Sequence, residues 1–131
     1  MTLRDFKERF MRLESHIVQE KGDFALFALF LREEEPGRWD LIAAAPWVVI
    51  DRQKATEYFI DKIKSVLGTQ SLMDLSRIVL VDPDHADVAD LNREIAVEHG
   101  AVEVKDTVFS GLAVKHALII TSKRRAAPVA G

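Results

Sequence analysis

The stretch from Phe24 to Leu31 constrains the fold most, because it is apolar on both of its alternating faces. Successive side chains of a β-strand point to opposite sides, so a strand with no polar face has to be covered on both. We therefore expect a central strand between two layers. One predicted face carries Phe24, Leu26, Ala28 and Phe30, and the other carries Ala25, Phe27, Leu29 and Leu31.

A second apolar run, residues 38–45, follows after Glu33-Glu34-Glu35-Pro36-Gly37. Pro-Gly favours a turn, and three successive glutamates fit poorly in a core. The two runs therefore predict a β-hairpin. Pro46 cannot donate a backbone hydrogen bond, so we expect it to end the regular pairing of the second strand.

Three segments show the 3.6-residue apolar period of amphipathic helices: residues 3–21, 51–67 and 84–99. Each begins at a residue that can cap a helix and ends at a glycine, which adopts left-handed backbone conformations without strain. The predicted caps are Thr2, Asp51 and Asp84, and the predicted stops are Gly22, Gly68 and Gly100.

Further strands are predicted at residues 78–81, weakly at 102–104, and at 114–121, with a turn at residues 109–112. The order is α-β-β-α-β-α-(β)-β. The strand–helix–strand segment from Ile78 onward should cross over right-handedly and give a parallel pair. We expect an α+β (α/β-like) fold with a mixed sheet of about five strands, an N-terminal hairpin and three main helices. The predicted core includes Phe10, Phe27, Phe59, Leu91 and Ile119, and Trp47.

The 131 residues suit one domain, which we place at residues 1–122, followed by a flexible basic tail at 123–131. The absence of cysteine excludes disulfides, a thiol nucleophile and thiolate metal sites. A net charge of −3 makes nucleic acid an unfavoured partner. The first residues lack the apolar run of a signal peptide, and no stretch is long enough to span a membrane, so we expect a cytoplasmic protein.

Four dispersed residues form one candidate catalytic set: Glu14, Asp40, Glu103 and Lys105. A strand aspartate followed by Glu-x-Lys is similar to the pattern of restriction-endonuclease-like nucleases, in which carboxylates hold Mg²⁺ or Mn²⁺ and the lysine helps to activate water. This chain departs from that pattern, since a helix, a strand and another helix separate Asp40 from Glu103. The set predicts a metal-dependent hydrolase as an alternative function.

The loop after strand 78–81 is a second candidate site, because ligands bind beyond the carboxyl ends of strands in open sheets. Asp82, Asp84 and His85 lie there and can orient a polar ligand, which predicts a ligand sensor. The alternative is structural, with Asp84 serving only as a helix cap.

The leading prediction is an interaction or regulatory module that binds a protein partner or a second copy of itself as a homodimer, with no catalysis, cofactor or metal. It is based on the 48% apolar content, the hairpin and the segregated charge. Residues 82–103 hold seven acidic residues and one basic residue, whereas five basic residues and one acid follow from Lys105. Trp39, beside the hairpin turn, is the candidate interface anchor.

Overall fold

The computed structural model describes residues 2–123, so of the tail predicted at residues 123–131 only Lys123 is described, and residues 124–131 lie outside the described residues. It confirms the α+β class: a mixed five-stranded sheet has the order β3-β2-β1-β5-β4, with β1 in the centre as predicted. Among the described strands, β2 and β3 are parallel and the other neighbours antiparallel. The strands are β1 (Leu26–Arg32), β2 (Trp39–Ala44), β3 (Leu75–Val81), β4 (Val102–Phe109) and β5 (Leu112–Ser122).

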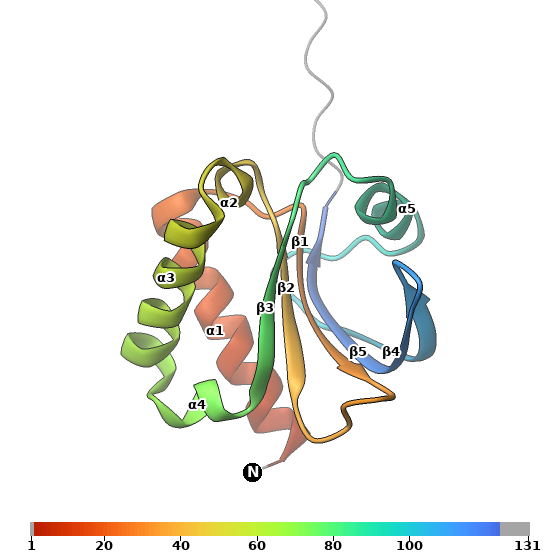
Figure 1. Cartoon of the computed structure of the whole chain (residues 1–131), viewed down its shortest axis with the longest axis horizontal. Coiled ribbons are helices and arrows are strands. Elements are labelled where there is room, and N and C mark those ends of the chain that lie inside the picture. Colours follow the sequence, from red (N-terminus) through yellow and green to blue (C-terminus); the bar gives the residue numbers. More distant parts are fainter. Residues whose placement is uncertain (1, 124–131) are drawn as a thin grey trace, which may run out of the picture.

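Helices cover the two faces of this sheet unequally (Figure 1). The first face carries most of the helical residues, and α5 (Ala86–Glu94) lies over the second. The first-face elements are α1 (Leu3–Lys21), α2 (Pro46–Ile50), α3 (Arg52–Lys62), the π-helical turn η1 (Ile63–Leu67) and α4 (Gln70–Met73).

Each face has its own hydrophobic core. On the first face, Phe10 and Leu13 of α1 pack with Phe27 of β1 and Phe59 of α3. The second face has a smaller cluster, in which Val88 is the fully buried residue of α5. Part of the second face therefore stays uncovered.

Several local predictions are confirmed. The Asp5 amide donates to the Thr2 hydroxyl (3.1 Å) at the start of α1, and Gly22 ends that helix with a φ of 92°. Asp51 caps α3 by accepting from the Lys54 amide at 3.1 Å. Pro46 ends β2 and begins α2, because proline suits the first turn of a helix.

The predicted parallel pair from Ile78 onward is wrong. The parallel pair is β2–β3, and the chain between them runs through α2, α3, η1 and α4. β3 occupies one edge of the sheet, so the chain crosses the second face through α5 and places β4 at the opposite edge, beside β5.

The predicted helix over residues 84–99 is too long. His85 rather than Asp84 is the N-cap of α5, and the helix ends at Glu94. Ile95 is extended and Val97 pairs with Ser122, because both side chains pack against the second-face cluster. His99 consequently lies in a loop with a φ of 51°.

The weak strand predicted at 102–104 extends to Phe109 as β4. Lys105 pairs with His116 and Thr107 with Val114, while Asp106 between them has a φ of 53°. This irregularity interrupts the alternation of side chains that would otherwise reveal the strand. The predicted turn between β4 and β5 is confirmed.

Four predicted core residues are fully buried: Phe10, Phe27, Phe59 and Ile119. Leu91 is only partly buried, because α5 covers a limited part of its face. Trp47 is also partly buried and stacks on Phe59 with ring centroids 5.4 Å apart. Within residues 2–123, no helix has the length and apolar character needed to cross a membrane.

Candidate functional site

A groove of about 380 Å³ opens on the second face of the sheet, where α5 does not cover it. Its apolar surface comes from β1, β2, β3, β5 and the end of β4, because alternate side chains of these strands point to the same side. The apolar lining includes Phe30, Ile42, Val79, Val81, Phe109 and Val114.

The tip of the β4–β5 hairpin lines part of this groove. Ser110 and Gly111 have φ values of 51° and 80°, as in the tight turns that match the twist of a hairpin. The turn brings Phe109 against Phe30, with ring centroids 5.1 Å apart in an edge-to-face arrangement. The hairpin therefore holds an aromatic side chain at the groove.

A charged cluster lies in the groove around Asp40, which is only 2% exposed. Its carboxylate accepts hydrogen bonds from Nε of Arg32 (2.7 Å) and from Nε of Arg77 (3.1 Å). The hydrogen bond to Asp40 raises the pKa of Arg32. Register explains the cluster, because Asp40 pairs with Phe30 on one side and with Arg77 on the other.

The loop after β3 also contributes to the groove, at the carboxyl end of a parallel strand. Asp82 and His85 line it, whereas Asp84 is not among the lining residues. Asp82 accepts from the Asp84 amide (2.8 Å) and His85 Nδ1 accepts from the Asp87 amide (3.1 Å). These bonds hold the loop in place and leave Nε2 of His85 without a partner among the described residues.

The dispersed catalytic set is not brought together. Asp40 lies on the second face, whereas Glu14 belongs to α1 on the first. Glu103 and Lys105 pair with Leu118 and His116, whose side chains also face the first side. Asp40 is therefore separated from Glu14 by the sheet, and its carboxylate is already shared by two guanidinium groups.

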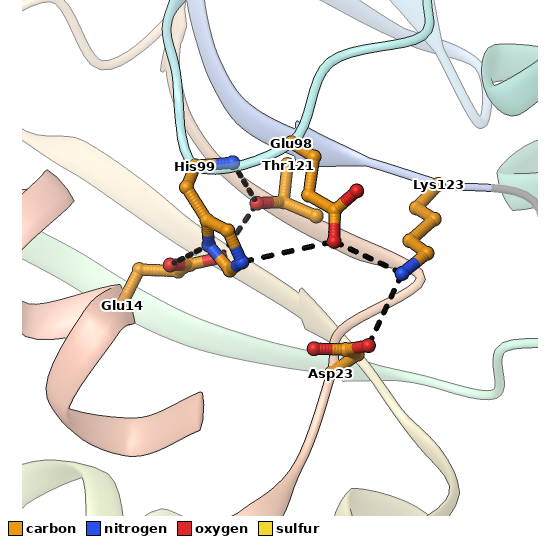
Figure 2. A network of polar contacts seen from close by, with 6 residues as sticks. All are labelled: Glu14, Asp23, Glu98, His99, Thr121 and Lys123. Atoms are coloured by element: carbon orange, nitrogen blue, oxygen red, sulfur yellow. Dashed lines mark hydrogen bonds and ion pairs between the residues drawn. The ribbon is translucent and has the colours of Figure 1, made fainter. Parts of the chain in front are cut away.

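Glu14 forms a separate polar network with His99 and Thr121, shown in Figure 2. Its carboxylate is fully buried and lies 2.7 Å and 3.0 Å from Nδ1 of His99. The Thr121 hydroxyl donates to Glu14 at 2.6 Å and accepts from the His99 amide at 3.2 Å. The register between β1 and β5 shifts beside Thr121, and such a bulge redirects side chains.

Asp23, Glu98 and His99 are the described residues whose ligand atoms could surround a metal ion, since these atoms lie within 4.8 Å of one another. Lys123 stands among them, with Nζ 2.9 Å from Glu98 and 3.1 Å from Asp23 (Figure 2). These hydrogen bonds, led by the one to Glu98, raise the pKa of Lys123. An ion at this place would therefore have to displace an ammonium group from both carboxylates.

Trp39, the candidate interface anchor, is partly buried at the edge of the first core. Its ring lies 5.1 Å from that of Phe6 and 5.5 Å from that of His116. A role for Trp39 in binding a partner stays a prediction.

Sequence reasoning missed the arginines of the groove and the pairing of Glu14 with His99. Arg32 and Arg77 contact Asp40 from 8 and 37 residues away in the chain. The one available signal was that a buried strand such as β2 contains an aspartate, which requires compensating charge. Glu14 gave a similar signal, since it lies among the apolar positions of an amphipathic helix.

Comparison with known proteins supplies no function for this arrangement. No family model, curated protein or solved structure matches the chain. The functional argument therefore depends on the geometry of the groove and the two polar networks.

Proposed function

We propose that this protein binds a small organic molecule in the groove on the second face and acts as a ligand sensor. The observation that carries this proposal is the groove itself: about 380 Å³, an apolar floor, and charged groups at its margin. Small-molecule sites have volumes of about 300–1,000 Å³ and combine apolar walls with a few polar groups. The loop from Asp82 to His85 connects the groove directly to α5, which would report binding.

A small molecule suits this groove better than a protein segment. Residues of the hairpin tip and of the start of α5 line the groove together with the strands, so an occupant contacts side chains on more than one side rather than lying on a flat face. Ligands in such clefts bury most of their surface, which lets few contacts produce measurable affinity. The self-association predicted from the sequence stays a prediction.

The test uses the neutral fluorescent probe N-phenyl-1-naphthylamine. We expect saturable binding, and we expect Val79→Trp to weaken it by about tenfold or more, because the indole fills the groove. Val108→Trp is the matched control, since Val108 is 69% exposed on β4 and does not line the groove. Thermal unfolding verifies that both variants fold.

Hydrogen exchange gives a second measurement on the same samples. Bound probe should slow exchange of amides in residues 82–88, which adjoin the groove. The proposal is overturned if no saturable binding occurs, or if the folded Val79→Trp variant binds the probe as the wild type does.

A further inference from the structure

Arg77 is a guanidinium group of the groove that is held in place by Asp40 and still keeps unused hydrogen-bond donors, whereas the third lining arginine, Arg52, is exposed and has no contact with Asp40 among the described residues. Its Nε donates to Asp40 at 3.1 Å, and its side chain is 45% exposed. No partner of its two terminal nitrogens occurs among the described residues. Arg32, by contrast, is 14% exposed and donates to Asp40, Glu34 and Ser76. Arg77 is thus the arginine of this pair that can still bind an anion.

Asp40 holds the side chain of Arg77 in an orientation that suits anion binding. A guanidinium group is planar and presents paired N–H groups that match a carboxylate. Holding Nε on a buried carboxylate reduces the rotamer freedom that Arg77 would otherwise lose on binding. Asp40 is shared by both guanidinium groups and Glu34 pairs with Arg32 alone, so Arg77 has no carboxylate of its own among the described residues.

The remaining lining charges limit the ligand to a single negative charge. The groove is lined by three arginines and three aspartates, so its total charge is close to zero. Asp82 and Asp87 would repel a second anionic group near the start of α5. A carboxylate fits this balance better than a phosphate monoester, which carries about two charges at neutral pH.

The floor next to Arg77 is apolar. Arg77, Val79 and Val81 alternate along one face of β3, and roughly 13 Å separate the first from the last at 3.3 Å per residue. A ligand anchored at Arg77 therefore extends over Val79 toward Val81. We infer that this protein binds an apolar monocarboxylate, with Arg77 as the carboxylate receptor and Asp40 as its positioning residue, an inference that rests on the proposed function.

The experiment measures displacement of N-phenyl-1-naphthylamine by octanoate, by 1-octanol and by octylammonium. We expect octanoate to displace the probe from wild-type protein at a concentration about tenfold lower than octanol, because only octanoate can bind Arg77 in a bidentate manner. Octylammonium should be the weakest competitor. Arg77→Gln should remove the preference for octanoate over octanol, with the displacement by each competitor compared against the probe affinity measured for the same variant.

Arg38→Gln is the matched control, because Arg38 is exposed in the hairpin turn and does not line the groove. Equal displacement by octanoate and octanol from a protein that binds the probe would overturn this inference and leave the proposed function standing. A preference for octanoate over octanol that persists in Arg77→Gln would likewise overturn this inference and leave the proposed function standing. Absence of binding by the probe and by all three competitors would overturn the proposed function itself.

Discussion

The two buried carboxylates, Glu14 and Asp40, are compensated differently. Asp40 has two guanidinium groups beside it, which stay charged at any working pH. Glu14 has an imidazole and a hydroxyl. A buried carboxylate that loses its partner costs far more than the pair contributes, because the remaining charge cannot reach water. Glu14 therefore makes the stability of the fold depend on His99.

Substitution of His99 by alanine should be more damaging than substitution of Glu14 by glutamine. His99→Ala leaves the Glu14 carboxylate buried with Thr121 as its donor, and we expect a loss of about 3 kcal/mol in the free energy of unfolding. Glu14→Gln removes the charge and keeps an acceptor for Thr121, so its cost should be about 1 kcal/mol. Chemical denaturation measures both.

Glu98→Ala is the control for His99→Ala, since Glu98 is 48% exposed and approaches the same ring at 3.8 Å. Its effect should stay within about 0.5 kcal/mol, as for other exposed ion pairs. If His99→Ala proves as mild as Glu98→Ala, the imidazole does not compensate the buried carboxylate.

At the scale of secondary-structure elements, the stability of the β4–β5 hairpin depends on the backbone conformation of the turn that joins the two strands. Gly111 has a φ of 80°, and a Cβ placed there would meet no atom within 4 Å. Gly111→Ala should therefore destabilise the fold through backbone strain alone, by about 1 kcal/mol. Gly37→Ala is the matched control, because Gly37 has equal space and no positive φ. We expect it to be neutral or slightly stabilising, and equal losses in the two variants would contradict the argument.

Helices α1 and α3 are joined by a polar contact that depends on pH. Glu20 of α1 pairs with Lys62 and accepts from the Tyr58 hydroxyl at 3.0 Å, and the Lys62 hydrogen bond lowers the pKa of Glu20 from its ordinary value of 4.5. A lowered pKa in the folded state stabilises the protein above the unfolded value. That stabilisation disappears as pH falls through the folded value.

Glu20→Gln removes this titration. The melting temperature of the wild type should exceed that of Glu20→Gln above about pH 5, and the difference should shrink as the pH falls below 4.5. Glu57→Gln on the exposed side of α3 is the control, with no comparable change expected. A difference between wild type and Glu20→Gln that is constant from about pH 7 to pH 3 would exclude ionisation of Glu20 as the cause.

For the molecule as a whole, the sequence predicted features that depend on neighbouring residues better than contacts between residues far apart in the chain. The two apolar faces of residues 24–31 identified the central strand, because side-chain alternation is a local property. The position of Asp82 and His85 directly after the strand predicted at residues 78–81 indicated the loop that lines the groove. The pairing of Glu14 with His99 spans 85 residues, and no local pattern encodes such a contact. The end of α5 was mispredicted for the same reason, since Val97 leaves the helix to pair with Ser122.

The unequal covering of the sheet predicts that α5 opens before the rest of the molecule. Of its nine residues, Val88 is the fully buried one. Asn92 attaches the helix by donating to the Ala25 carbonyl (3.0 Å) and to the Ser122 hydroxyl (2.8 Å). In native-state hydrogen exchange, amides of α5 should show a lower opening free energy and a smaller denaturant slope than those of β1. Equal values for α5 and β1 would mean that the molecule unfolds as one unit.

Asn92→Ala should lower the opening free energy of α5 by about 1–2 kcal/mol, because it removes both hydrogen bonds. Asp90→Ala, on the exposed side of the same helix, is its control and should change the opening free energy little.

Since the groove adjoins the start of α5, a ligand that requires the closed helix should raise the opening free energy of α5. At a hundredfold excess over its Kd, the increase should be about 2.7 kcal/mol. A bound probe that leaves α5 exchange unchanged would show that the groove and the helix are not coupled, and a sensor would then need another element to report its ligand.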